Sequence, residues 1–160
     1  MPARLEPIRP KRPFLVGMKR FDIEVGAAQQ AAAEEALRRY ERITSNWKTK
    51  VTFHIRKLKG GVAVGTRNKV FNFLDKGTKP HIIRPKRSRV LRFQASYKAK
   101  TKPGSLTSGG GGATGSPVFT ARPVQHPGTQ AREFTPRIAA EMRKVYSREM
   151  RKAISRLVGR

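Results

Sequence analysis

The amino-acid sequence predicts an α+β fold, in which an antiparallel sheet of about four to five strands packs against two long helices. Three observations indicate this class. An alanine-rich segment at residues 27–37 has high intrinsic helix propensity. A second segment, after Pro136, carries apolar residues at helical spacing. Between them, short runs of alternating apolar and polar residues are separated by glycine and proline, which is typical of strands and turns.

The N-terminal part of the chain divides into an arm and the first long helix. Residues 1–13 hold four prolines among basic residues, a composition that excludes a helix or a central strand and predicts a basic, proline-rich arm. We expect residues 14–160 to form a single domain, in keeping with the chain length. Within it, a helix is predicted from Gly26 to Ile43, with an apolar stripe that includes Leu37 and Tyr40.

A hairpin and one ambiguous element follow the first helix. The segment Trp47–Arg56 is predicted as a strand, because apolar side chains alternate along it with basic and polar ones. A turn at Gly60 and Gly61 and a return strand at Val62–Thr66 complete the hairpin. The apolar run Val70–Leu74 is too short for periodicity to distinguish a short helix from a buried strand.

Two strands, a long loop and the second helix are predicted in the C-terminal half. Val90–Ala95 and Val118–Val124 are predicted as strands, and the proline near the end of the second requires an edge or a bulge. The glycine-rich stretch at residues 98–117 is predicted to be a flexible loop. Thr135 then supplies a capping hydroxyl and Pro136 the first helical position of the last helix, which ends near Gly159.

Two stiff corners of similar chemistry stand out in this sequence. Each combines a glycine, which tolerates positive φ, with a proline that fixes its own φ and excludes helix before it. We predict that the two corners lie close together and fix how the last helix meets the sheet. The histidine of the first corner is predicted to hydrogen-bond within the turn rather than to act as a catalyst. The structural corner residues are Gly77, Thr78, Lys79, Pro80, His81, His126, Pro127, Gly128 and Thr129.

Composition indicates an anionic partner. The chain carries 36 Lys and Arg against 10 Asp and Glu, for a net charge of +26. Solubility requires a net charge of only about 2–8 in a small domain, so the excess favours a nucleic acid or an acidic protein as a neighbour. The absence of cysteine excludes disulfides, cysteine–zinc sites and a cysteine nucleophile. Without a long apolar run or a signal-peptide pattern, we expect a soluble protein made in a cytoplasm, with no membrane contact.

The residues give little support for an enzyme, a cofactor or a metal site. His54, His81 and His126 are far apart in sequence, and no nucleophile, base and orienting group occur in a recognisable pattern. The glycine run lacks the Gly-Lys-Ser/Thr that would follow a phosphate-binding loop. We therefore predict a non-enzymatic protein without cofactor or metal.

Basic residues on the predicted strand, on a charged turn and on the last helix are the candidate contacts to a partner or to DNA. Contact with the DNA backbone, without reading of base sequence, is the expectation for such residues. The candidates are Lys48, Lys50, Arg56, Arg84, Lys86, Arg87, Arg89, Arg143, Lys144 and Arg151.

The two corners also carry a family resemblance. Gly77-Thr78-Lys79-Pro80-His81 after Phe73-Leu74-Asp75, then Val124-Gln125-His126-Pro127-Gly128-Thr129 and Arg132-Glu133-Phe134 before a terminal helix, resemble the tail-component family of long-tailed double-stranded DNA bacteriophages. The order of elements is similar over residues 25–158. The family more often has Arg-Pro-Phe where this chain has Arg-Glu-Phe, and the glycine-rich stretch looks like an insertion.

The resemblance implies a structural protein of the phage neck or tail, located in the virion and in the host cytoplasm during assembly. It implies copies of the chain in an oligomeric ring, with the head–tail connector and the tail-terminator or tail-tube proteins as partners, and it allows contact with phage DNA. Tail-completion, tail-terminator and head-closure roles all stay open.

Two other interpretations remain from the residues alone. One is a sequence-nonspecific nucleic-acid-binding protein of the ribosomal or nucleoid-associated kind, supported by the excess of basic residues. The other is a small ribonuclease, such as a toxin, in which His81 or His126 acts as a base.

Overall fold

The computed structural model describes residues 17–107 and 109–158, so the predicted arm at residues 1–13 and the predicted helix stop at Gly159 lie outside the described range. Helices and small antiparallel sheets together confirm the α+β class, with one long helix near each end. In chain order the elements are α1 (Met18–Thr44), β1 (His54–Leu58), β2 (Gly61–Gly65), α2 (Lys69–Lys76), β3 (His81–Ile83), β4 (Leu91–Gln94), β5 (Pro117–Thr120), β6 (Val124–His126) and α3 (Phe134–Val158).

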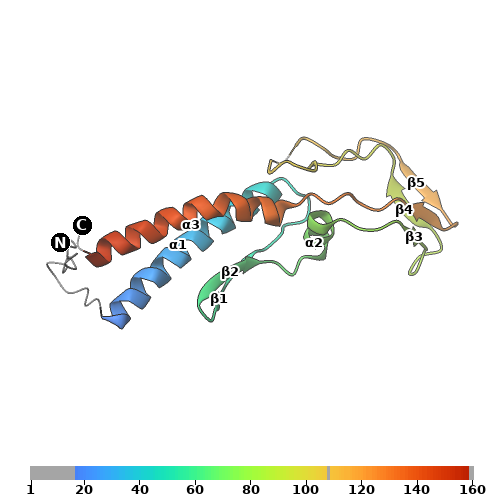
Figure 1. Cartoon of the computed structure of the whole chain (residues 1–160). Coiled ribbons are helices and arrows are strands. Elements are labelled where there is room, and N and C mark those ends of the chain that lie inside the picture. Colours follow the sequence, from blue (N-terminus) through green and yellow to red (C-terminus); the bar gives the residue numbers. More distant parts are fainter. Residues whose placement is uncertain (1–16, 108, 159–160) are drawn as a thin grey trace, which may run out of the picture.

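The helices α1 and α3 lie side by side and antiparallel, and form one end of an elongated molecule (Figure 1). Arg156 pairs with Glu24 near one end of the helix pair at 2.7 Å, and Arg39 pairs with Glu141 near the other. The helix α1 begins at Met18, eight residues before the predicted start at Gly26, and this glycine lies inside the helix.

The predicted single sheet of four to five strands is wrong. The strands instead form three separate two-stranded antiparallel sheets, β1 with β2, β3 with β6, and β4 with β5. The first hairpin packs beside the helices, whereas the other two sheets lie at the far end of the molecule (Figure 1). We call residues 81–126, which contain these two distal sheets and their connections, the β arm.

The predicted strand Trp47–Arg56 is correct only at its end. Strand β1 begins at His54, because its partner β2 ends at Gly65, opposite His54, and offers no ladder to earlier residues. Val51 and Phe53 are nevertheless buried, while Thr52 between them is exposed. The alternation of apolar and polar residues here reflects which side chains pack against the core. Burial alone produced the period of two that predicted the strand.

An aromatic core joins the helical end of the molecule. Phe53 and Phe71 meet edge to face with ring centroids 5.1 Å apart, and Phe71 stacks on Phe134 at 5.7 Å. Tyr40 stacks on Phe53 at 4.9 Å, and burial raises the pKa of its phenol above the ordinary value. Because aromatic pairs contribute about 0.5–1.5 kcal/mol beyond their area burial, this cluster ties α1, α2 and α3 together. The buried members of the core are Tyr40, Ile43, Val51, Phe53, Phe71, Phe134 and Ile138.

The ambiguous run Val70–Leu74 belongs to the helix α2. The Asn68 side-chain oxygen accepts a hydrogen bond from the Phe71 N–H at 3.0 Å, which is an N-cap. At the other end, Gly77 has φ of 75° and ends the helix as its C-cap. The helix α2 therefore ends at the glycine of the first corner.

The sequence predicted that Thr135 caps the start of α3, but the cap is a residue of α2. The helix begins at Phe134, so Thr135 and Pro136 lie inside its first turn. The Asp75 carboxylate, only 8% exposed, accepts a hydrogen bond from the Thr135 N–H at 2.9 Å. A carboxylate at this position satisfies a free N–H and interacts favourably with the positive end of the helix dipole.

The predicted final strand Val118–Val124 is also wrong as a single element. It is divided between β5 and β6, which belong to different sheets. Pro123 lies between them, where its lack of an N–H disturbs no ladder. The proline separates two strands where an edge or a bulge had been predicted.

The glycine-rich stretch at residues 98–117, predicted as a flexible loop, forms no helix or named strand over its described residues before Pro117, which begins β5. It folds back along the preceding segment. The Lys98 N–H donates to the Gly112 carbonyl at 2.8 Å, and Tyr97 forms a β-bridge with Ala113. The Asn46 side chain, just after α1, donates to the Gly109 carbonyl at 3.0 Å. These contacts attach the stretch to the rest of the chain.

Replacing Asp75 tests the cap that joins α2 to α3. We expect Asp75→Ala to lower the free energy of unfolding by about 1–2 kcal/mol, since it leaves the Thr135 N–H without a partner. Asp75→Asn keeps an acceptor oxygen and should cost less. The exposed Asp22→Ala in α1 is the control and should change the free energy by less than about 0.5 kcal/mol. Equal losses for Asp75→Ala and Asp22→Ala in urea unfolding would contradict this role.

Candidate functional site

The two corners lie against each other, as the sequence predicted. Thr78 and Thr129 exchange two backbone hydrogen bonds, of 2.9 and 3.0 Å. The pairing continues into the β arm, where His81 lies opposite His126. The corners are thus the junction at which the β arm joins α2 and α3.

Both corner glycines are required by backbone conformation and by close approach. Gly77 has φ of 75° and Gly128 has φ of 87°, in the region that other residues rarely adopt. A Cβ atom on Gly77 would lie 2.7 Å from the Thr129 carbonyl oxygen, and one on Gly128 would lie still closer to that of Thr78. Each glycine therefore permits the backbone contact that the opposite corner makes.

The two corner histidines bond within their own turns. The His126 Nδ1 accepts a hydrogen bond from the Gly128 N–H at 3.0 Å. The His81 Nδ1 lies 2.9 Å from the Lys79 carbonyl oxygen, so this nitrogen carries the proton that it donates. The two rings are in contact, with centroids 5.0 Å apart. The hydrogen bond predicted for His81 within its turn is therefore present.

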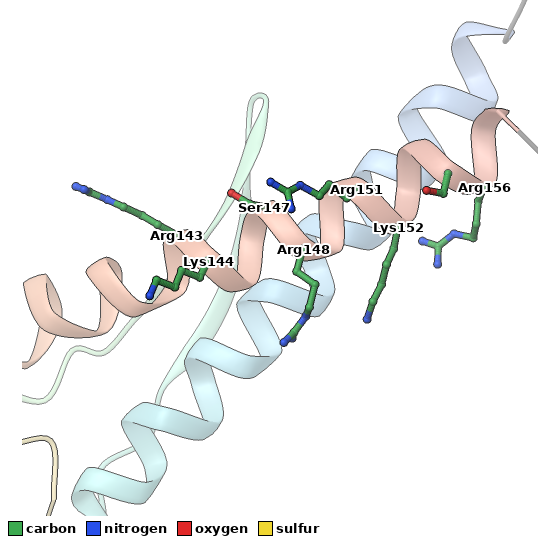
Figure 2. Close-up of a pocket in the computed structure, with 8 residues that line it drawn as sticks. Arg143, Lys144, Ser147, Arg148, Arg151, Lys152 and Arg156 are labelled. Carbon is green, nitrogen blue, oxygen red and sulfur yellow. The ribbon is translucent and has the colours of Figure 1, made fainter. Parts of the chain in front are cut away.

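A second candidate site is the outer side of α3. Eight exposed residues line an open groove of about 770 Å³ along this helix between residues 143 and 156. Figure 2 shows the long basic side chains projecting away from the helix axis, at intervals along it. We call this surface the cationic face of α3. Its members are Arg143, Lys144, Ser147, Arg148, Arg151, Lys152, Ser155 and Arg156.

The cations of this face fall into two sets. Arg148 and Lys152 both pair with Glu149, at 2.9 and 3.1 Å, and their hydrogen bonds hold the pKa of Glu149 below its ordinary value. Arg156 pairs with Glu24 of α1. The remaining three have no ion pair or hydrogen bond with any residue that the structure describes, and they are Arg143, Lys144 and Arg151.

The structure does not bring the ten sequence-predicted cations into one surface. Arg143, Lys144 and Arg151 share the cationic face of α3. Lys48 and Lys50 lie in the irregular segment after α1, and Arg56 lies on β1. The other four, Arg84, Lys86, Arg87 and Arg89, lie in the connection between β3 and β4, on the β arm.

Sequence reasoning missed part of this face and the junction carboxylate. Arg148, Lys152 and Arg156 continue the row of Lys144 at intervals of four residues, which is a helical signal that the sequence did carry. Asp75 offered no local signal, because the N–H that it caps is 60 residues further along the chain.

The described residues contain no group of three His, Cys, Asp or Glu side chains that could hold a metal ion. The structure places His81 beside His126, while His54 belongs to β1. Among the described helices, none is both long enough and apolar enough to cross a membrane.

Comparison of the chain with protein-family models, with curated proteins and with solved structures finds no match.

Alanine substitutions at the corner glycines test the junction. We expect Gly77→Ala and Gly128→Ala each to lower the free energy of unfolding by about 2 kcal/mol or more, because each strains φ and forces two carbonyl-bearing segments apart. Gly26→Ala is the matched control. It lies within α1 with open space around a Cβ, and should raise stability by about 1 kcal/mol. Corner variants as stable as the unchanged chain in urea unfolding would contradict the assignment.

Proposed function

We propose that this chain is a structural subunit of the neck or tail of a long-tailed bacteriophage. In this proposal, copies of the chain form an oligomeric ring that completes the tail or joins it to the DNA-filled head. The observation that carries the proposal is the β arm, which presents apolar side chains without a core of its own to cover them.

The β arm has almost no buried residues. Thr101 is the only buried residue that the structure describes between residues 81 and 126. Two-stranded sheets are marginally stable by themselves in water, and the arm consists of two of them. Apart from Leu106, which packs against the aromatic core, the arm has little burial to stabilise it, and a covering surface would supply more.

The exposed side chains of the β arm fit a protein partner. Phe119 is 58% exposed and Phe93 is 44% exposed, and Arg92 lies over the Phe119 ring at 5.8 Å. By the register of β4 and β5, Phe93 shares a face with Val118 and Phe119 shares the other face with Arg92, so the sheet exposes a phenylalanine on each face. Exposed apolar surface of this kind is a candidate interaction site. The other large exposed apolar side chains of the arm are Ile82, Ile83, Val90, Tyr97 and Val118.

Charge narrows the kind of partner. Residues 81–126 contain no Asp or Glu, so with histidine counted as neutral every charged side chain of the β arm is a lysine or an arginine. A connector or tail protein with an acidic rim around an apolar centre would complement this surface. Copies with a net charge of +26 each repel one another, so ring closure would depend on such an acidic partner or on DNA.

The resemblance to phage tail components supports the same proposal. Its most specific residues are the two corners, and these form the junction from which the β arm extends. A head-to-tail contact between the arm of one copy and the body of the next is the kind of interface that closes into a ring.

The cationic face of α3 favours a second candidate function, a sequence-nonspecific nucleic-acid-binding protein. The β arm distinguishes the two candidates. Binding to phosphates needs only a basic surface, whereas the arm presents Phe93 and Phe119 for contact with another protein.

The presence of the chain in virions is the primary test. Mass spectrometry of purified virions of the phage that encodes the chain should detect it, and cryo-electron microscopy should place it in a ring at the head–tail junction. Absence from purified virions would contradict the proposal.

A double substitution tests the role of the β arm within the particle. We expect Phe93→Ser with Phe119→Ser to reduce incorporation into virions at least about tenfold, equivalent to losing about 1.4 kcal/mol of interface free energy. The matched control replaces Leu58 and Ile154, which are similarly exposed outside the arm, with serine. Equal incorporation of both double variants, measured by quantitative mass spectrometry, would show that the arm is not the docking surface.

A further inference from the structure

We propose that the cationic face of α3 is the surface along which duplex DNA lies, through contacts to its phosphates. This deepens the proposed function by naming the partner of one surface, and it rests on the proposed function only in taking phage DNA as the natural duplex. The β arm then contacts protein while α3 contacts nucleic acid.

The first support is a group of cations on α3 that have no ion pair, beside others on both long helices that do. Arg38 and Arg39 of α1 both pair with Glu35. The hydrogen bonds from Arg38 hold the pKa of that carboxyl below its usual range. On α3, Arg143, Lys144 and Arg151 have no carboxylate partner among the described residues. Their charges are available for an external anion.

The helix dipole does not explain these three positions. Cations near a helix C-terminus are stabilising, but the effect falls off within the last turn. Lys144 is 14 residues from the end of α3 at Val158, which is about four turns. Only Arg156 lies in the last turn.

The dimensions of the face match an extended polyanion. The helix rises about 1.5 Å per residue, so the stretch from Arg143 to Arg156 is about 20 Å long. A duplex carries one charge per about 1.7 Å of its axis, which places about a dozen phosphates beside this length. Neighbouring cations in the row Lys144, Arg148 and Lys152 are about 6 Å apart.

Two serines give the backbone of such a ligand room to approach. Ser147 and Ser155 are the short side chains of the groove, and the longer basic residues flank them. Serine hydroxyls are common donors to phosphate oxygens in protein–DNA contacts. The groove therefore combines close approach at the serines with charge on either side.

The chemistry of the face favours nucleic acid over an acidic protein. All eight of its residues are basic or are serines, whereas the centre of a protein–protein interface requires apolar and aromatic anchors. Protein–DNA interfaces are more polar and strongly positive. The β arm is also basic, but it adds exposed apolar side chains such as Phe93 and Phe119, which the cationic face lacks.

The direct test is binding of the purified full-length chain to a fluorescent 30-base-pair duplex of mixed sequence, measured by anisotropy between 50 and 300 mM NaCl. The variant Arg143→Gln, Lys144→Gln, Arg151→Gln removes the three unpaired cations without loss of helix propensity. We expect the slope of log K against log salt to fall in magnitude by about 2.7, and Kd at 150 mM salt to rise about 100-fold.

The matched control is Lys86→Gln, Arg87→Gln, Arg89→Gln on the β arm, which removes the same charge. For this control, the slope of log K against log salt should stay within about one unit of the slope of the unchanged chain. A second variant, Ser147→Glu with Ser155→Glu, keeps every cation and should also abolish tight binding, because it places negative charge in the groove. Circular dichroism checks that each variant is folded.

The inference is overturned if both triple variants weaken binding equally, or if the unchanged chain does not bind the duplex. It is also overturned if a poly-glutamate chain of equal charge binds α3 as tightly and loses as much affinity in the α3 variant. The proposed function fails separately, through absence of the chain from virions. A chain present in virions whose α3 variant binds DNA normally would reject only the present inference.

Discussion

The structure depends on one junction between segments that are far apart in sequence. Four backbone hydrogen bonds join residues 74–78 to residues 129–133, among them the reciprocal pair between Thr78 and Thr129. The Asp75 carboxylate adds the cap on α3. Because Gly77 and Gly128 alone permit this approach, the junction sets both the start of α3 and the direction in which the β arm leaves the body.

The junction separates two regions with different physical chemistry. On one side, helices and aromatic rings make a core, and most of the carboxylates pair with arginines or lysines. On the other side, the β arm has two small sheets, exposed phenylalanines and no carboxylate. The first region has a buried core, whereas almost all residues of the second are exposed or partly exposed. Under the proposed function, a partner would cover the second region. This division of the chain is the basis of the proposed assembly role.

The sequence predicted the features that local chemistry determines. Alanine content and helical spacing located both long helices, and the glycine–proline corners predicted the pairing of Gly77–His81 with His126–Thr129. Sequence-based prediction failed where the local structure depends on residues that are distant in sequence. The alternation around Val51 and Phe53 reflects burial against aromatic rings, and no neighbouring strand is available there. Whether strands joined one sheet or three depended on contacts such as that between His81 and His126, 45 residues apart. Whether Asp75 or Thr135 capped α3 depended on a contact across 60 residues.

Hydrogen–deuterium exchange, measured on the isolated chain and on the chain within its assembled particle, tests the central claim most directly. If the β arm obtains its core from a partner, the amides of β3 to β6 should exchange rapidly in the isolated chain, while those of α1 and α3 are protected. In the particle, the arm should become protected as well. An arm that is already as protected as the helices in the isolated chain, and unchanged on assembly, would contradict the account.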